Sequence, residues 1–338
     1  MAKSGLTGMA DIVAPQGSPL GFAVISCRSL QASLGFYVDC IGFAAGPIGM
    51  WAGTDFERFW NLPTGSTART CVLTANKCAV GRVLLLEFSG ADRRLIQALP
   101  NSQAIGLVNL NFYTADARAA VAALRALGYT FWTEPTQHSL NAAVGNPIEV
   151  VFDGPDGVAM NLVELTSRDP GTRIGQMRAY VEKAGYTRQG FTPVVTTSHV
   201  TRSVDRACEF YEKVCGMGRL FEDVMTADHV NEFLRLPKGA RTKIVFMQGN
   251  HMFGKIAVSE PLNYLAQCVD LRSTACAPDI GYLAQIFEVR DLAQSLAAAS
   301  AAELVAARAL ATVPGLGTRD QALVRNPGSG ALTWLLQV

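Results

Sequence analysis

Two glutamates at the ends of apolar strand-like segments are the residues whose type and position could do chemistry. Glu87 closes the run at residues 83–86, and a carboxylate that loses solvation at such a place is suited to general-base chemistry. Glu260 ends a similar segment. Arg28 and Arg202 each follow another apolar segment and are candidate anion binders. A structural alternative stays open, in which Glu87 and Glu260 only pair with Arg28 and Arg202.

An internal repeat relates these residues to one another. Residues 18–63 align with residues 192–237 without a gap, and nine of the 46 positions are identical. The identical pairs are Pro19/Pro193, Arg28/Arg202, Ser29/Ser203, Phe36/Phe210, Tyr37/Tyr211, Gly42/Gly216, Phe59/Phe233, Leu62/Leu236 and Pro63/Pro237. After a one-residue deletion the alignment resumes, so that Glu87 meets Glu260. The chain is therefore a tandem duplication.

A smaller unit, one strand, one helix and three strands, occurs four times. Residues 20–27 read as the first strand, and residues 29–41 have the apolar spacing of an amphipathic helix. The second unit includes an expected strand near residues 129–133. The last segment, 322–338, aligns with 149–165, an alignment that assigns residues 303–309 to a strand rather than to an Ala-rich helix. We predict four βαβββ modules.

Composition limits the classes of partner. The chain has 338 residues with 29 basic and 28 acidic side chains, so no charged field favours nucleic acid or a membrane surface. We expect a small-molecule partner, and a homodimer stays open. Eight cysteines without a C-x-x-C pair suggest a reduced, cytoplasmic protein. The start does not resemble a signal peptide, and no apolar run is long enough to span a bilayer.

Several short motifs resemble the vicinal oxygen chelate superfamily, which includes glyoxalase I, extradiol dioxygenases and bleomycin-resistance proteins. They are residues 34–37 (LGFY) with 41–43 (IGF), residues 209–211 (EFY) with Gly216, the turn at 155–157 (PDG) and residues 84–88 (LLLEF). The resemblance implies an α+β fold with the four modules paired into two domains, each a U-shaped mixed sheet around a concave pocket. We expect an N-terminal arm (1–17), a first domain (18–167), a linker (168–191) and a second domain (192–338).

The resemblance also implies where a metal would be held, on the first and last strands of each module. The corresponding residues are Phe22, Glu87, Asn109 and Asn161 in the first half and Thr196, Glu260, Ala284 and Trp334 in the second. Metals of this kind prefer His, Gln or carboxylate donors. The two pockets offer too few of them, so we predict that the protein has no metal site and needs no cofactor. Because side chains alternate along a strand, His199 points away from the face that carries Thr196, so it does not supply the missing metal ligand.

The resulting hypothesis is a metal-independent lyase, isomerase or cyclase that transfers protons on a small oxygen-bearing molecule, aromatic or polycyclic in character. The expected catalytic residues are Glu87 as base with Asn109 and Asn161 as oxyanion partners. The expected substrate-binding residues are Phe22, Arg28, Thr196, Arg202, Glu260 and Trp334. Two alternatives remain: a sequestering protein of the bleomycin-resistance type, and a metal-dependent dioxygenase- or glyoxalase-like enzyme with an atypical site.

Overall fold

The computed structural model describes residues 17–98, 101–138 and 145–338, and it confirms four βαβββ modules. The expected N-terminal arm lies outside these residues, except for residue 17. The first module contains β1 (Leu20–Ser26), α1 (Leu30–Leu34) continued by a π-helix (Gly35–Cys40), β2 (Ala44–Ala45), β3 (Gly49–Ala52), α2 (Thr54–Trp60), β4 (Thr67–Thr74) and β5 (Arg82–Ser89). The second contains β6 (Ala104–Thr114), α3 (Ala117–Ala126), β7 (Thr136–Gln137), β8 (Ile148–Asp153) and β9 (Ala159–Glu164).

The second half repeats this plan. The third module contains β10 (Thr196–Val200), α5 (Val204–Cys215), β11 (Gly218–Met225), α6 (Asp228–Phe233), β12 (Thr242–Gln248) and β13 (Lys255–Pro261). The fourth contains β15 (Gly281–Val289), α7 (Leu292–Ala298), β16 (Glu303–Val313), β17 (Gly317–Arg325) and β18 (Leu332–Gln337). The strand expected at 303–309 is thus confirmed as part of β16. Near 129–133 there is only an isolated bridge at Phe131, and the expected linker contains a helix, α4 (Arg173–Ala184).

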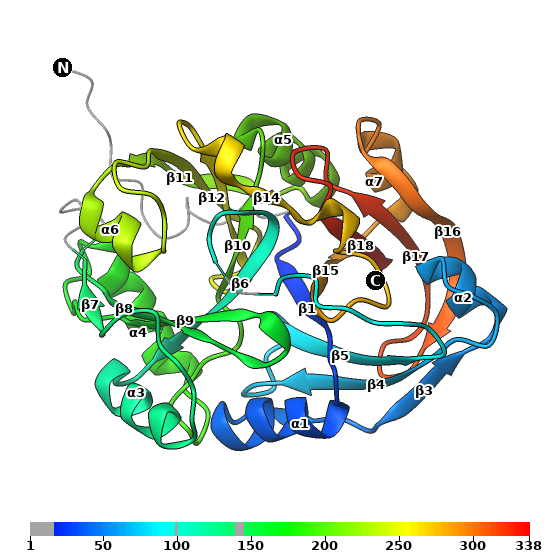
Figure 1. The fold of residues 1–338 in the computed structure, drawn as a ribbon, viewed down its shortest axis with the longest axis horizontal. Helices are drawn as coiled ribbons and strands as arrows, with labels where there is room; N and C mark the ends of the chain where they lie inside the picture. Colours follow the sequence, from blue (N-terminus) through cyan, green and yellow to red (C-terminus); the bar gives the residue numbers. More distant parts are fainter. Residues whose placement is uncertain (1–16, 99–100, 139–144) are drawn as a thin grey trace.

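The modules pair across the two halves of the chain, which corrects the expected domains at 18–167 and 192–338. Sheet 1 has the strand order β16-β17-β18-β15-β1-β5-β4-β2, with β3 on β4, and so joins the first and fourth modules. Sheet 2 has the order β11-β12-β13-β10-β6-β9-β8-β7 and joins the second and third. Figure 1 shows the orange strands β16 and β17 on the same side as the blue and cyan first module. The sequence repeat predicts each module but not the module with which it pairs, because sequence identity does not specify which strands are adjacent in a sheet.

Two glycines at equivalent repeat positions make the crossed pairing possible. Gly81 and Gly254 both have positive φ. The carbonyl of each accepts a backbone hydrogen bond from the residues that lead into the first strand of the opposite half of the chain. Val194 N donates to Gly81 O over 3.0 Å, and Leu20 N donates to Gly254 O over 2.9 Å. A Cβ at Gly81 would lie 2.1 Å from Val194 O. A side chain at either position would therefore clash with the crossing segment.

Each module helix begins with an N-cap side chain, and three of the four have a second cap from the last strand. The N-cap side chain accepts a backbone amide of the first turn: Ser29 from Ala32, Asp116 from Ala119, Ser203 from Arg206 and Asp291 from Gln294. In three modules a side chain of the last strand accepts the first helical amide: Glu164 from Ala117, Glu260 from Val204 and Gln337 from Leu292. Both caps satisfy amides that have no partner within a helix. Ser29 and Ser203 are thus identical in the repeat because each caps the start of a helix.

The helix-facing sides of the two sheets share one hydrophobic core with α1, α3, α5 and α7. A polar chain runs through it. His199 of β10 is fully buried; its Nδ1 lies 2.9 Å from the Tyr211 hydroxyl, which donates to Gln285 of β15. Burial lowers the pKa of His199 to about 3, so the ring is neutral at ordinary pH. No helix in the described part of the chain is long and apolar enough to cross a membrane.

The opposite, concave face of sheet 1 is filled by the protein's own aromatic side chains. Trp334 of β18 stacks on Trp51 of β3 at 5.6 Å between ring centroids and contacts Phe59 and Trp60 of α2. All four side chains are buried. We call this group, with the buried Phe56 and Phe88, the aromatic plug. Because α2 and β3 fold inward over the sheet, the concave face of sheet 1 is a second hydrophobic core.

The cap assigned to Glu260 predicts a purely structural effect. Glu260→Ala should lower the free energy of unfolding by about 1 kcal/mol, because the first amide of α5 loses its acceptor. Urea denaturation measures this. Ligand affinity should not change, and a variant with unchanged stability but weakened ligand binding would contradict the assignment.

The packing of the aromatic plug predicts that Trp334 contributes strongly to the free energy of unfolding. Trp334→Ala should lower the free energy of unfolding by about 3–5 kcal/mol, because the neighbouring rings cannot close the cavity that it leaves. Trp132→Ala is the matched control, since Trp132 is only partly buried and lies outside the plug. Denaturant titration of both variants should separate them, and equal losses would refute the plug.

Candidate functional site

The concave face of sheet 2 carries two adjoining cavities. The first, of about 180 Å³, is walled by Tyr113, Lys255 and α4, and we call it the Lys255 cavity. The second, of about 390 Å³, reaches His138 and α6, and we call it the His138 cavity. Both cavities are lined by Asn111, Glu149, Phe221 and Phe246. We refer to the two together as the trough.

Strand alternation supplies the polar wall of the trough. Along β6, Asn109, Asn111 and Tyr113 line the cavities, while Leu110 and Phe112 enter the shared core. Asn109 Oδ1 accepts a hydrogen bond from Ser198 N over 3.1 Å, which fixes its carboxamide. Because β6 and β10 are neighbours, the second and third modules both contribute to this wall.

A carboxylate lies at the junction of the two cavities. Glu149 of β8 accepts a hydrogen bond from Asn161 Nδ2 over 2.8 Å. Asn161 is 6% exposed, and its Oδ1 has no hydrogen-bond partner in the described structure. A buried amide oxygen without a partner is costly, and a ligand donor in the trough would satisfy it. Glu149 and Asn161 therefore form a polar pair that faces the cavity.

Lys255 introduces a buried amine into the same trough. The residue is 3% exposed, its Nζ donates to Met252 O, and it lies 5.9 Å from the centre of the Tyr113 ring. Burial lowers the pKa of Lys255 to about 7. Near neutral pH a large fraction of this amine is uncharged, and so it can act as a nucleophile or a base.

Two histidines stack at the far end of the trough. The rings of His138 and His229 are 6.0 Å apart and nearly parallel, and Phe233 packs edge-on against His138. Neither ring nitrogen of His138 has a partner in the parts of the chain that the structure describes. Burial lowers the pKa of His138, against the opposing effect of Glu149, so the neutral ring is favoured. This end can hydrogen-bond a ligand.

The structure brings together three of the residues expected at the site. Asn109 and Asn161 line the His138 cavity, and Thr196 lines the Lys255 cavity. The expectation that Asn109 and Asn161 share a pocket with Glu87 is wrong, because Glu87 belongs to sheet 1. His199 points away from the trough, as its strand position predicted.

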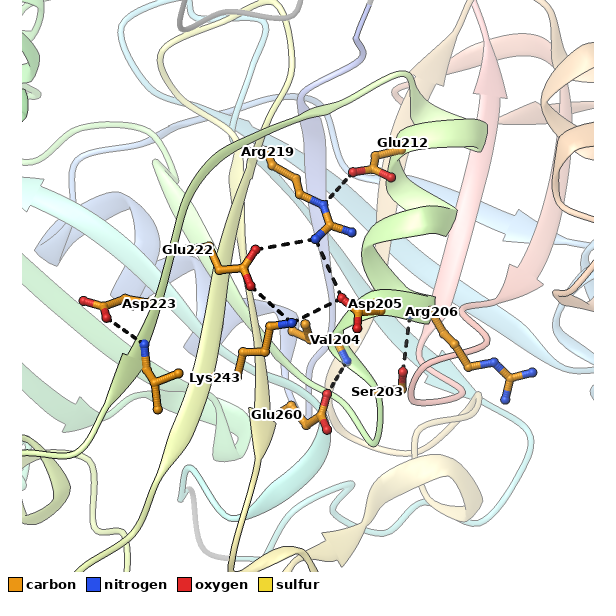
Figure 2. A network of polar contacts seen from close by, with 11 residues as sticks. Ser203, Val204, Asp205, Arg206, Glu212, Arg219, Glu222, Asp223, Lys243 and Glu260 are labelled. Atoms are coloured by element: carbon orange, nitrogen blue, oxygen red, sulfur yellow. Dashed lines mark hydrogen bonds and ion pairs between the residues drawn. The ribbon is translucent and has the colours of Figure 1, made fainter. Parts of the chain in front are cut away.

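Glu87 and Glu260 both lie on the helix-facing sides of their sheets. Glu87 follows Val83 and Leu85 of the shared core and forms an ion pair with Arg69 of β4 at 2.9 Å. Figure 2 shows the Glu260 carboxylate directed at the start of α5, where it accepts a hydrogen bond from Val204 N over 2.7 Å. Neither carboxylate is placed to reach a ligand held by Asn109 and Asn161.

The other four expected residues also lie outside the trough. Phe22 and Trp334 belong to the filled concave face of sheet 1. Arg28 is exposed, and Arg202 pairs with Asp270 at 2.7 Å. The alternative ion pairs Glu87–Arg28 and Glu260–Arg202 do not occur among the described residues. The polar concave face belongs to sheet 2, which joins the second and third modules.

The lining residues that were not anticipated include Glu149, Lys255, His138 and His229. The sequence contained a signal for one of them. The repeat aligns Lys255 with Arg82, and a charged residue at the start of an otherwise apolar strand is unusual. Glu149 has no such signal, because only its strand register shows that it faces inward. His138 and His229 meet through tertiary packing between a loop and α6.

The donor set of the trough does not fit a high-affinity metal centre. Among the residues that the structure describes, no group of three His, Cys, Asp or Glu side chains could hold a metal ion. The strand positions carry amides and hydroxyls, chiefly Asn109, Asn161 and Ser198, which bind such metals weakly. We therefore derive no step through a metal, and the expected absence of one stays a prediction.

Comparison with known proteins agrees with this geometry. Residues 20–162 match the model of the Glyoxalase/Bleomycin resistance protein/Dioxygenase superfamily. No protein with a curated description matches the chain. The fold is similar to that of glyoxalase I from Zea mays, with 14% identity, a TM-score of 0.57 and coverage of 95% of this chain and 92% of that one.

A protein from Bacillus subtilis described as a candidate dioxygenase has the same fold. It is 11% identical, its TM-score is 0.55, and the match covers 95% of this chain and 86% of that one. At these identities the solved structures establish the fold alone. The family model matches residues 20–162, and what the comparisons show for the chain as a whole is a fold similar to that of glyoxalase I.

Proposed function

We propose that this protein is an enzyme that transfers a proton on a small oxygen-bearing molecule bound in the trough of sheet 2. Glu149 is the general base, and Asn109 and Asn161 hold the oxygen that gains negative charge. This hypothesis keeps the reaction class suggested by the sequence, a lyase, isomerase or cyclase. It moves the base from Glu87 to Glu149.

The observation that carries the proposal is the position of Glu149. Its carboxylate lies at the junction of the two cavities and is held by Asn161 Nδ2 at 2.8 Å. A base must be fixed within reach of the ligand, and this hydrogen bond fixes it. The surrounding wall includes apolar side chains, such as Val163, Phe221 and Phe246, which exclude water from the ligand.

The reaction follows from these groups. Glu149 removes a proton from a carbon next to a carbonyl group, and the electron pair moves onto the carbonyl oxygen. Carboxamide N–H groups of Asn109 and Asn161 are suited to stabilise that oxygen. The proton then returns to a different carbon, which gives an isomer, or a leaving group departs, which gives a lyase product. Neither outcome requires an oxidant or a reductant.

A second candidate function is sequestration without turnover. The apolar part of the wall favours it, because Leu220, Phe221, Phe246 and Met252 can hold a flat, apolar ligand with no chemical step. Both candidates predict that a ligand stabilises the fold. Only the enzyme predicts exchange of a ligand proton with solvent.

The test begins with a ligand found by its effect on the melting temperature, from a panel of aromatic acids, quinones and polyketides. In deuterated water, NMR then follows exchange of the ligand's C–H next to its carbonyl. Glu149→Gln should keep the hydrogen bond to Asn161 and the ligand-induced stabilisation. Exchange should fall by about 10²–10⁴-fold, because the basic group is gone.

Glu209→Gln is the matched control, since Glu209 is exposed on α5 and pairs with Lys213. Its exchange rate should equal that of the unmodified protein. Exchange that survives in Glu149→Gln but disappears in Glu87→Gln would place the base on sheet 1 and contradict the proposal. Ligand binding with no exchange in the unmodified protein would favour sequestration.

A further inference from the structure

Lys255 lies at the start of β13 with its side chain in the wall of the Lys255 cavity. The side chain is almost completely buried, and its Nζ donates to Met252 O, the carbonyl of a residue three positions earlier. Among the described residues, no carboxylate lies within ion-pair distance of this amine. A buried lysine without such a partner is rare, because burial disfavours its charged form.

The equivalent position of the other sheet shows what is different here. The repeat aligns Lys255 with Arg82, and Arg82 forms an ion pair at 2.5 Å with Glu288 of β15, the strand on the other side of β1. It also stacks on the Phe22 ring at 3.7 Å. In sheet 2 the strand on the other side of β10 is β6, whose Tyr113 ring lies 5.9 Å from the Lys255 amine and carries no carboxylate. In sheet 1 Glu288 neutralises Arg82. Among the described residues of sheet 2, no carboxylate is close enough to pair with Lys255.

Desolvation therefore dominates at Lys255 and brings the pKa to about 7. The titratable groups that share the wall of its cavity are Tyr113 of β6, Glu149 of β8 and Arg173 of α4. His251 adjoins from the turn before β13, and Lys255 contributes to the lowered pKa of that ring. Burial of Tyr113 raises the pKa of its phenol beyond the physiological range. At neutral pH the cavity thus presents an amine that is uncharged in a large fraction of molecules, beside a neutral phenol.

We propose that Lys255 captures a carbonyl compound in this cavity as a Schiff base. The Nζ lone pair adds to the carbonyl carbon, and the carbonyl oxygen takes a proton to give a carbinolamine. That oxygen then leaves as water while nitrogen and carbon form a double bond. An amine and a carbonyl become an imine and water, so no oxidant or reductant is needed.

The walls define the class of carbonyl compound. Val163, Leu165, Ile174 and Met177 are apolar and line the same cavity as Lys255 and Tyr113. An apolar cavity of about 150 Å³ holds a molecule of benzene size, and this one measures about 180 Å³. The structure therefore favours an aromatic or branched aliphatic aldehyde or ketone. This inference rests on the proposed use of the trough as a small-molecule site and names its substrate class.

The test is reductive trapping on the full chain. Benzaldehyde and sodium cyanoborohydride are added, and peptide mass spectrometry locates the resulting benzyl group. Labelling should concentrate on Lys255 at neutral pH and should depend on pH with a midpoint near 7. Surface lysines, with a pKa of about 10.4, should react mainly at higher pH. Lys255→Met should remove the neutral-pH label, and Lys213→Met, which changes an exposed lysine, should not.

A second reagent makes the outcome independent of ligand fit and of the variant's folding. Competitive labelling of the unmodified protein with trace acetic anhydride measures the reactivity of each amine across pH. Lys255 should titrate near pH 7. If Lys255 resists both reagents, or if Lys255→Met, folded, keeps the neutral-pH benzyl label, the inference is overturned. Loss of proton exchange in Glu149→Gln is a separate measurement, so either proposal can fail while the other stands.

Discussion

The pairing of first strands across the two halves of the chain is the constraint on which the rest of the structure depends. β1 lies antiparallel to β15, and β10 lies antiparallel to β6. Each sheet is therefore complete only when both halves of the chain are folded. Gly81 and Gly254 permit this arrangement, because each lies against the backbone of the segment that crosses from the other half. Every residue of the trough therefore depends on contacts between distant parts of the sequence.

The two sheets began from one plan and have diverged in opposite directions. In sheet 1, α2 and β3 carry Trp51, Phe59 and Trp60 onto the concave face, where they pack with Trp334. Apolar burial there stabilises the fold. In sheet 2 the concave face has kept amides, hydroxyls and Glu149 around open space. Among the described residues no carboxylate pairs with Lys255 as Glu288 pairs with Arg82, and the Lys255 side chain lines the cavity instead. We therefore propose that sheet 1 serves stability and sheet 2 serves chemistry.

Much of the fold could be predicted from the sequence, because local signals specify it. The period-two strands, the Ser29 and Ser203 helix starts and the repeat predicted four modules of the right kind. The pairing of modules could not be predicted, because strand neighbours are set by tertiary contacts that the repeat does not encode. Asn109, Asn161 and Thr196 were assigned to pocket walls and lie in the trough.

The position of Glu87 away from the trough has a simple physical origin. Glu87 and Glu260 occupy the helix-facing side of the last strand, as Glu164 does in the second module. Asn161 and Glu164 are three residues apart on one strand and so point to opposite faces. A glutamate that recurs at this position satisfies a helix start in two of the modules. Recurrence in a repeat can mark a structural requirement as readily as a catalytic one.

The central claim is that the chain holds its ligand on the concave face of sheet 2 and not of sheet 1. A crystal structure with a ligand that raises the melting temperature tests this directly. We predict electron density in the trough, in contact with Glu149 and Asn161, with the aromatic plug unchanged. Density within sheet 1, with Trp51 and Trp334 moved apart around the ligand, would contradict the account.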